Sequence, residues 1–332
     1  MSAARQLTLV PVPAHGAEDV LVVDGLVYTG TEEGSIFRLR PDGSRIDRVG
    51  HTGGRPLGLE LLSDGRLLVA DADRGLLALD PYDGGIESLV TSVNGRRMRF
   101  CNNAAVAANG DIWFSDSSTV YGIAHWKKDF TEDTRTGRLL VRRATGLVEV
   151  VLEGLAFANG VALAADESYV AVAESGARTV VRHWLTGPRA GERDLLAEDL
   201  PGYPDNISRG SDGLVWVTIA SPTDRIVERL HRSPMVLRRQ ATRIPDVIQP
   251  QPKRTARVQA YDDAGRLVHD LHGDGSAYHM VTGVREHDGQ VWLGSLVESA
   301  VASMTVTGRI RWSWLTTTGQ TRKAGHWVIS TS

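Results

Sequence analysis

The sequence predicts an all-β chain folded as a six-bladed β-propeller, and three observations lead to that prediction. The first is a repeated unit, in which a turn, Asp-Gly or Asn-Gly in all units but the fourth, precedes a strand rich in β-branched and aromatic residues; the fourth has Glu-Ser in place of the Gly. The second is the number of units: six are found, spaced about 40 to 75 residues apart, near the period of propeller blades. The third is the content of 35 glycines in 332 residues, which suits a chain with many turns better than a helical one.

The repeated strands occur through most of the chain. In order, they lie in residues 24–31, 63–72, 109–118, 166–175, 211–221 and 287–296. Each is followed by a second turn and a further strand, so that every unit holds several short strands. Six similar units are hard to divide between two domains, which disfavours a β-sandwich or two stacked β domains. We therefore expect a single propeller domain over residues 1–332.

Two kinds of segment fall outside the repeat. Residues 224–240 place apolar positions such as Ile226 and Leu230 among arginines, which predicts an amphipathic helical insertion after the fifth blade's inner strand, interrupted at Pro234. We interpret it as a lid over the propeller, with a membrane-surface helix as the alternative. At the chain ends, residues 6–10 and 309–314 both look like strands, and either could complete the last blade and close the ring.

Composition narrows the class of protein. A formal net charge of -3 gives no reason to expect a nucleic acid as partner. The single cysteine, Cys101, excludes an internal disulfide and is compatible with a reducing compartment. No apolar stretch is long enough for a signal peptide or for a membrane span. These features predict a soluble, cytoplasmic protein; they leave the oligomeric state open.

Oxygen-bearing side chains precede four of the predicted inner strands, and they indicate the site. The loops that enter the inner strands of a propeller converge at one end of the channel, so residues far apart in sequence meet there. The segments are residues 15–19, 100–103, 155–161 and 203–207, which between them offer a Glu, two Asn and an Asp. Each alone is typical of a turn, but together they form an all-oxygen set with two negative charges. Such a set suits a hard cation, Ca²⁺ above Mg²⁺, and does not suit Zn²⁺.

Five segments carry a family resemblance over nearly the whole chain: residues 54–81, 100–118, 157–175, 201–217 and 221–240. In them the chain resembles the calcium-dependent six-bladed propellers of the senescence-marker-protein/gluconolactonase superfamily, and in particular its strictosidine-synthase-like branch. The resemblance implies that Glu18, Asn102, Asn159 and Asp205 bind Ca²⁺. It also implies that the cation polarises a lactone carbonyl or a phosphoester oxygen while Asp205 acts as base or nucleophile. Asn103 replaces an Asp that usually follows the first Asn.

The resemblance also argues against one activity. Strictosidine synthases condense an amine with an aldehyde without a metal and depend on a Glu at the start of the sixth blade. Thr282 takes that place here, and one cysteine cannot form the disulfide of the plant enzymes. We therefore predict a Ca²⁺-dependent hydrolase of a lactone or related ester. The alternatives are a ring-forming or isomerising enzyme of natural-product metabolism, and a propeller without enzymatic activity that binds a ligand or a protein.

Further residues are candidates for the substrate pocket or for catalysis. His279 precedes the sixth inner strand and is a candidate base, and Glu298 is a candidate for the pocket wall. His125 and Trp126 lie in a long insertion between strands of the third blade, which we expect to cover the pocket mouth. Asn103 and Thr282 complete the set of predicted pocket residues.

Overall fold

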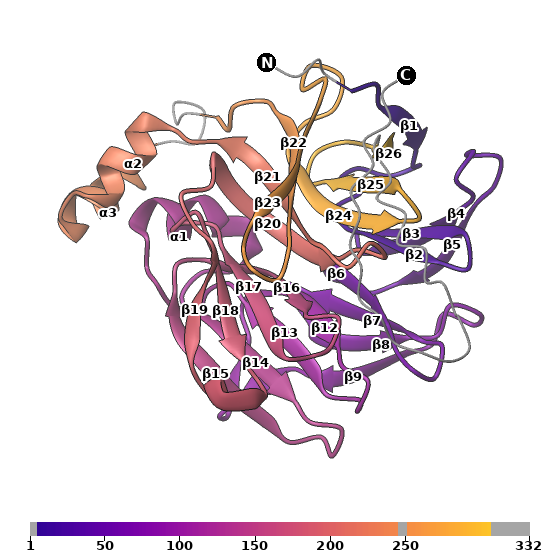
Figure 1. Cartoon of the computed structure of the whole chain (residues 1–332), viewed down its shortest axis with the longest axis horizontal. Helices are drawn as coiled ribbons and strands as arrows, with labels where there is room; N and C mark the ends of the chain where they lie inside the picture. Colours follow the sequence, from indigo (N-terminus) through magenta and orange to yellow (C-terminus); the bar gives the residue numbers. More distant parts are fainter. Residues whose placement is uncertain (1–4, 245–250, 307–332) are drawn as a thin grey trace, which may run out of the picture.

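The computed structural model describes residues 5–244 and 251–306, and these form a ring of six four-stranded antiparallel sheets (Figure 1). The prediction of a six-bladed β-propeller is confirmed. Blade one consists of β2 (Val20–Val23), β3 (Leu26–Gly30), β4 (Ser35–Leu39) and β5 (Ile46–His51). Blade two consists of β6 (Pro56–Leu61), β7 (Leu67–Asp71), β8 (Gly75–Leu79) and β9 (Ile86–Val90). A small hairpin, β10 (Ser92–Val93) and β11 (Arg96–Arg97), follows it.

The remaining blades repeat the same order, with the inner strand first. Blade three is β12 (Cys101–Val106), β13 (Ile112–Asp116), β14 (Gly137–Arg142) and β15 (Val148–Leu155). Blade four is β16 (Ala158–Leu163), β17 (Tyr169–Glu174), β18 (Thr179–Trp184) and β19 (Arg193–Ala197). Blade five is β20 (Gly202–Arg209), β21 (Val215–Pro222), β22 (Ala256–Tyr261) and β23 (Leu267–Gly273). The six strands that repeat in the sequence are all the second strands of their blades.

The N-terminal strand closes the ring. Blade six is β24 (Val281–His287), β25 (Gln290–Ser295), β26 (Ala300–Thr305) and, outermost, β1 (Thr8–Pro11). β1 pairs antiparallel with β26, so that Thr8 lies opposite Ser303 and Pro11 opposite Ala300. Of the two closing segments that the sequence offers, the N-terminal one makes this pairing. The other, residues 309–314, lies outside the described residues.

The helices interrupt blades three, four and five. Blade three carries η1 (Ile123–His125) and α1 (Trp126–Glu132), and blade four carries η2 (Gly187–Arg189). Blade five carries α2 (Arg225–His231) and α3 (Met235–Ala241), which project beside the ring in Figure 1. The predicted insertion is therefore present, but it leaves the blade after its second strand, β21, and not after its inner strand. The helices separate at Pro234, as the sequence predicts.

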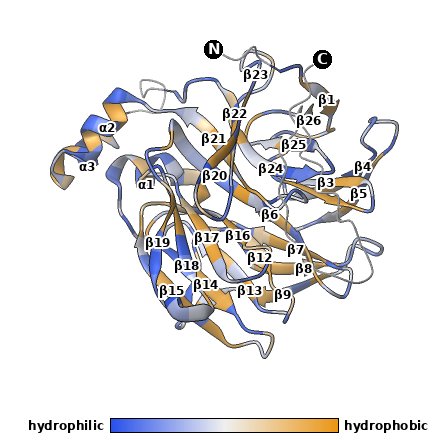
Figure 2. Ribbon diagram, in the orientation of Figure 1, coloured by the Kyte–Doolittle hydropathy of each residue, from blue (hydrophilic) through white to orange (hydrophobic). Residues whose placement is uncertain are grey.

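The core is divided among the interfaces between neighbouring blades. One cluster of buried apolar side chains lies at each of the six interfaces, such as Ala171 and Ala173 of blade four with Val217 and Ile219 of blade five. Figure 2 shows apolar residues along the strands and polar residues in many of the turns. Burial of apolar area between sheets stabilises the ring and makes it a rigid support for the site.

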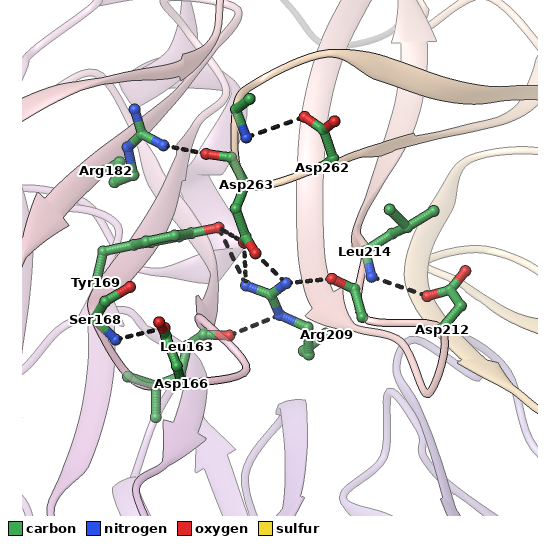
Figure 3. A network of polar contacts seen from close by, with 12 residues as sticks. Leu163, Asp166, Ser168, Tyr169, Arg182, Arg209, Asp212, Leu214, Asp262 and Asp263 are labelled. Atoms are coloured by element: carbon green, nitrogen blue, oxygen red, sulfur yellow. Dashed lines mark hydrogen bonds and ion pairs between the residues drawn. The ribbon is translucent and has the colours of Figure 1, made fainter. Parts of the chain in front are cut away.

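A polar network links blades four and five at the far end of β20 from Asp205 (Figure 3). Arg209 Nε donates to the Leu163 carbonyl at 3.0 Å, and its guanidinium contacts the Tyr169 hydroxyl at 3.1 Å and Asp263 Oδ1 at 3.0 Å. The Tyr169 hydroxyl donates to the same carboxylate at 2.5 Å. Charge-assisted bonds of this kind fix the relative position of two neighbouring blades.

Candidate metal centre and substrate pocket

The predicted ligands lie at irregularities of the inner strands. The pairing of β12 with β13 shifts register between Cys101 and Ala104, where Asn102 lies. β16 shifts between Ala158 and Val161, and β20 shifts between Pro204 and Ile207. A β-bulge re-aims the side chains of a strand. Asn102, Asn159 and Asp205 occupy these bulges, inside the strands and not in loops before them as the sequence suggested.

Corresponding positions in the other blades complete a ring of six. Register shifts in β6 and β24 enclose Leu57 and Thr282, and Glu18 lies just before β2. Five of the six line one cavity of about 260 Å³: Glu18, Leu57, Asn102, Asn159 and Asp205. Thr282 is buried and does not line it; its hydroxyl donates to the Glu18 carbonyl at 3.0 Å. Thr282 therefore positions Glu18, whereas the sequence placed it in the pocket.

The two asparagines are held by matching serine contacts. Asn102 Nδ2 donates to Ser117 Oγ at 2.9 Å, and that hydroxyl donates to the Ala158 carbonyl at 2.7 Å. In the next blade, Asn159 Nδ2 donates to Ser175 Oγ at 3.2 Å. The Ser175 hydroxyl in turn donates to the Pro204 carbonyl at 2.6 Å. Each contact fixes the amide so that the opposite atom, Oδ1, is left for another partner.

We call the end of the cavity formed by Glu18, Asn102, Asn159 and Asp205 its floor. Three buried oxygen atoms at this floor lack a hydrogen-bond partner within the described part of the chain. They are Oδ1 of Asn102, Oδ1 of Asn159 and Oε2 of Glu18, although the last lies 3.5 Å from the Arg55 guanidinium. Buried oxygens without partners are uncommon in folded proteins and need an explanation. A cation bound between them would provide one.

The electrostatics of the floor also favour a bound cation. Burial raises the pKa of Glu18 to about 8, against the opposing charge of Arg55. Burial raises the pKa of Asp205 to about 7, against a hydrogen bond from Asn159. Asp205 keeps an edge open to the cavity, whereas Glu18 is buried. Two desolvated carboxylates close to one another are unfavourable unless a positive charge compensates them.

The donor set fits a hard divalent cation. Two carboxylates and two neutral amide oxygens are ligands that Ca²⁺ accepts. The described residues contain no cluster of three or more His, Cys, Asp or Glu side chains that could hold a metal ion, so binding at this site depends on the two amide oxygens as well as the two carboxylates. Arg55 also contributes a positive charge beside the floor, since it contacts both Glu18 and Glu32. Sequence reasoning missed Arg55 because nothing in the Gly-Arg-Pro stretch distinguishes it from a surface arginine.

A layer of alternating side chains and glycines fills the channel beneath the floor. Asn103 Oδ1 accepts from the Val161 amide at 2.9 Å, and Asp19 Oδ2 accepts from the Leu59 amide at 2.9 Å. Asn206 Nδ2 donates to the Leu57 carbonyl at 3.2 Å. The intervening blades carry glycine at the same level: Gly58, Gly160 and Gly283. Asn103, predicted to line the pocket, therefore belongs to this layer.

The walls of the cavity are apolar and aromatic. Phe100 and Phe157 meet edge to face with ring centroids 5.4 Å apart, and Phe130 meets Tyr203 in the same way at 4.8 Å. Trp126 of α1 also lines the cavity, as the sequence predicted. Residues of α2 such as Leu230 contribute as well, so the insertion covers the pocket as a lid. A polar floor beneath apolar walls suits a ligand with one oxygen-rich end and an apolar body.

The other predicted residues lie around the pocket. His279 Nδ1 lies 2.5 Å from Glu298 Oε1, and both side chains are about a quarter exposed, at 24% each. His279 faces an adjacent groove that shares Met280 and Leu296 with the cavity. His125 is exposed and faces a separate groove on the outer side of α1. The structure thus places His279 beside the cavity and His125 away from it.

Comparison with known proteins relates the chain to one family. Residues 102–188 match the Strictosidine synthase family, and residues 2–39 match the family described as strictosidine synthase-like, N-terminal. The adipocyte plasma membrane-associated protein of Salmo salar is 33% identical over 84% of this chain and 73% of that protein. Protein STRICTOSIDINE SYNTHASE-LIKE 10 of Arabidopsis thaliana is 35% identical over 74% of this chain and 68% of that protein.

Solved structures share the fold. A gluconolactonase from Xanthomonas campestris superposes with a TM-score of 0.66 at 15% identity, covering 91% of this chain and 90% of that one. Regucalcin, a calcium-binding protein from Agrobacterium tumefaciens, gives a TM-score of 0.61 at 14% identity, covering 90% and 92%. At these identities the likeness concerns the fold alone.

One expectation from the sequence is wrong. A cytoplasmic location is contradicted by the relatives from Salmo salar, Rattus norvegicus and Homo sapiens, whose names associate them with the plasma membrane. Among the helices of the described residues, none has the length and apolar character needed to cross a bilayer.

Proposed function

Since this chain belongs to the strictosidine synthase-like family, we propose that it is a Ca²⁺-dependent hydrolase that opens a lactone or a related ester with an apolar body. The observation that carries the proposal is the cavity floor. There, the unpaired oxygens of Glu18, Asn102 and Asn159 meet the open carboxyl group of Asp205 beneath aromatic walls. This combination of charge and unsatisfied acceptors is costly for the protein unless it serves a ligand.

The four ring positions with oxygen ligands would hold the cation: Glu18, Asn102, Asn159 and Asp205. When bound, a Ca²⁺ ion supplies Lewis-acid polarisation of the substrate carbonyl. Ser117 and Ser175 keep the two amide oxygens directed at the floor, because each serine occupies the amide nitrogen.

Asp205 is the group placed to move the proton. It is the one carboxyl group at the floor that keeps an edge open to the cavity. Water adds to the carbonyl carbon and gives its proton to the Asp205 carboxylate. The C–O bond of the ester then breaks, and the proton passes to the leaving oxygen. Phe100, Phe130 and Phe157 keep other water away from the ester and bind the apolar body.

His279 has a supporting part in this proposal. Its ring is held by Glu298 and faces the groove that opens beside the cavity. We assign it to contact a polar group of the substrate that extends past Met280 and Leu296. An amine–aldehyde condensation is disfavoured, because Thr282 offers no carboxyl group and its hydroxyl is bonded to the Glu18 carbonyl.

The test combines calorimetry with activity. Chelator-treated wild type, Asp205→Asn and Asp199→Asn are titrated with Ca²⁺ and assayed on a panel of aliphatic and aromatic lactones and esters. Asp199 has a side chain that is 92% exposed, so the control makes the same change of charge outside the pocket. We expect wild type and Asp199→Asn to bind Ca²⁺ and to hydrolyse with it, and Asp205→Asn to lose both. Calcium binding without hydrolysis would favour a ring-forming enzyme or a binding protein, and absence of calcium binding would refute the ligand set.

A further inference from the structure

We propose that the outer face of the lid, formed by α2 and α3, binds the surface of an anionic lipid bilayer. This inference concerns the side of the lid that faces away from the pocket. It does not depend on the proposed hydrolysis, because its readout is binding to vesicles.

Large apolar side chains are gathered on the outer face of the lid. Val236 is 69% exposed and Leu237 is 56% exposed, and neither lines the pocket, whereas Ile226 lines it. Exposed apolar residues occur elsewhere too, singly at Leu147 in the turn between β14 and β15 and as the pair Leu267 and Val268 in β23, but these stand alone or are less exposed as a group than the three consecutive residues of the lid. Val236 and Leu237 are consecutive and lie in one short helix, with Met235 beside them at 37%. A concentration of apolar area on one exposed element marks an interaction surface.

The acidic and the basic side chains of α2 have different surroundings. Asp224 caps α2 by accepting from the Ile226 amide at 2.8 Å and lies 3.4 Å from Lys253. Glu228 accepts from the Tyr203 hydroxyl at 3.2 Å and lies 3.5 Å from Arg178. The acidic groups of the lid are thus engaged with the propeller.

Three arginines of α2 and its C-terminal cap are not engaged with the propeller. Arg225, Arg229 and Arg232 are exposed. None of these guanidinium groups forms an ion pair with a carboxylate within residues 5–244 or 251–306. Exposed arginines in the same insertion as exposed Val236 and Leu237 are the combination that binds anionic headgroups while apolar side chains enter the interface. This charge distribution favours a lipid surface over a second copy of a chain whose net charge is only -3.

The lid is already folded and anchored, so the face is presented without rearrangement. Arg238 Nη1 donates to the Glu132 carbonyl at 3.0 Å, and His231 Nε2 lies 2.7 Å from the Phe130 carbonyl. Thr242 Oγ1 donates to Glu132 Oε1 at 3.1 Å. Since α1 lines the cavity together with α2, a bilayer on the lid would lie next to the pocket mouth. Apolar substrates could then enter from the membrane.

The first experiment is vesicle sedimentation with the full chain. Vesicles contain phosphatidylcholine alone or with about a third phosphatidylserine. The variants are Val236→Asp/Leu237→Asp, Arg229→Gln/Arg232→Gln and, as matched control, Leu147→Asp. We expect wild type and Leu147→Asp to bind the anionic vesicles, and each lid double variant to bind at least about tenfold more weakly. Added salt should weaken wild type far more than the arginine variant.

A second measurement, the fluorescence of a label on the lid, separates loss of vesicle binding from misfolding of a variant. Cys101 is buried and burial raises the pKa of its thiol, so Leu237→Cys can be labelled selectively with an environment-sensitive fluorophore. We expect a blue shift on anionic vesicles for the label at position 237 and none for a label at Leu147→Cys. Absence of vesicle binding by wild type, or equal binding by the aspartate variant, would overturn the proposal. So would a wild-type dimer in light scattering that the aspartate variant abolishes, because the face would then bind a second copy.

Discussion

The hydroxyl of Thr282 donates a hydrogen bond of 3.0 Å to the backbone carbonyl of Glu18. The two residues are 264 positions apart in the chain, and the bond joins the inner strand of the last blade to the segment that enters the first. One contact therefore serves both the closure of the ring and the position of a proposed calcium ligand. The geometry of the metal centre is thus tied to the stability of the propeller.

Replacing Thr282 by Val should affect stability and calcium binding together. The change keeps the shape of the side chain and leaves the buried Glu18 carbonyl without its donor, so we expect a loss of about 1–2 kcal/mol in the free energy of unfolding. Urea denaturation measures this loss, and calorimetry measures the expected decrease in calcium affinity. Thr282→Ser retains the hydroxyl and should restore both. If Val were tolerated with unchanged affinity, Thr282 would have no positioning role.

Replacing Ser175 by Ala should weaken calcium binding, in addition to a loss of about 1–2 kcal/mol in the free energy of unfolding for the buried hydrogen bonds that it removes. The serine holds the Asn159 amide nitrogen and donates to the Pro204 carbonyl. Without it, Asn159 can turn its NH₂ group toward the floor, which repels a cation. We expect a decrease of about tenfold or more in calcium affinity by calorimetry. The exposed Ser63→Ala serves as control. Equal affinity of the two variants would show that the serine does not orient Asn159.

Replacing Gly160 by Ala should destabilise the whole propeller. A Cβ atom at this position would lie 2.0 Å from the Ile207 amide nitrogen, inside the layer that fills the channel. Backbone would have to move in two blades, so we expect a loss of about 3 kcal/mol, measured by urea denaturation. At Gly122 the nearest atom to an added Cβ is the Arg99 carbonyl oxygen at 3.2 Å. Gly122→Ala should therefore be close to wild type; a similar loss in both variants would contradict the proposed packing.

The stability of the metal-free protein should fall as pH rises. Folding raises the pKa of Glu18 to about 8 and that of Asp205 to about 7, because both are desolvated. Between about pH 5 and pH 8 the folded state therefore binds protons that the unfolded state has released. The free energy of unfolding then decreases with rising pH. We expect a decrease of several kcal/mol across this range for chelator-treated protein, since each raised group contributes about 1.4 kcal/mol per pH unit over which only the unfolded state has released its proton.

Two comparisons test the origin of this pH dependence. Glu18→Gln/Asp205→Asn removes two of the titrating groups and should reduce the dependence, as measured by thermal unfolding from pH 5.5 to 8; Asp19, whose pKa burial raises to about 7, accounts for the part that remains. Added Ca²⁺ should reverse it, because binding requires the ionised carboxylates and stabilises the folded state. A metal-free protein that gains stability with rising pH would show that these carboxyl groups are not desolvated.

Several features could be predicted from the sequence because they depend on local patterns. The Gly-led strands repeat six times, and that number fixes the number of blades. The interleaved arginines and apolar residues of residues 224–240 predicted helices, and Pro234 placed the break between them. The segments that hold Glu18, Asn102, Asn159 and Asp205 could be selected because they have comparable places in different repeats, and the family resemblance singled out the four residues; all four line one cavity.

Only the tertiary structure decided which polar residues face the cavity and which support it. Asn102 and Asn103 are neighbours of the same type, yet the bulge in β12 directs the first to the cavity and the second into the channel layer. Thr282 and Glu18 contact each other only because the ring closes. Periodicity is a property of one strand, whereas bulges, cross-blade hydrogen bonds and the exposure of the lid arise from packing between segments that are distant in sequence.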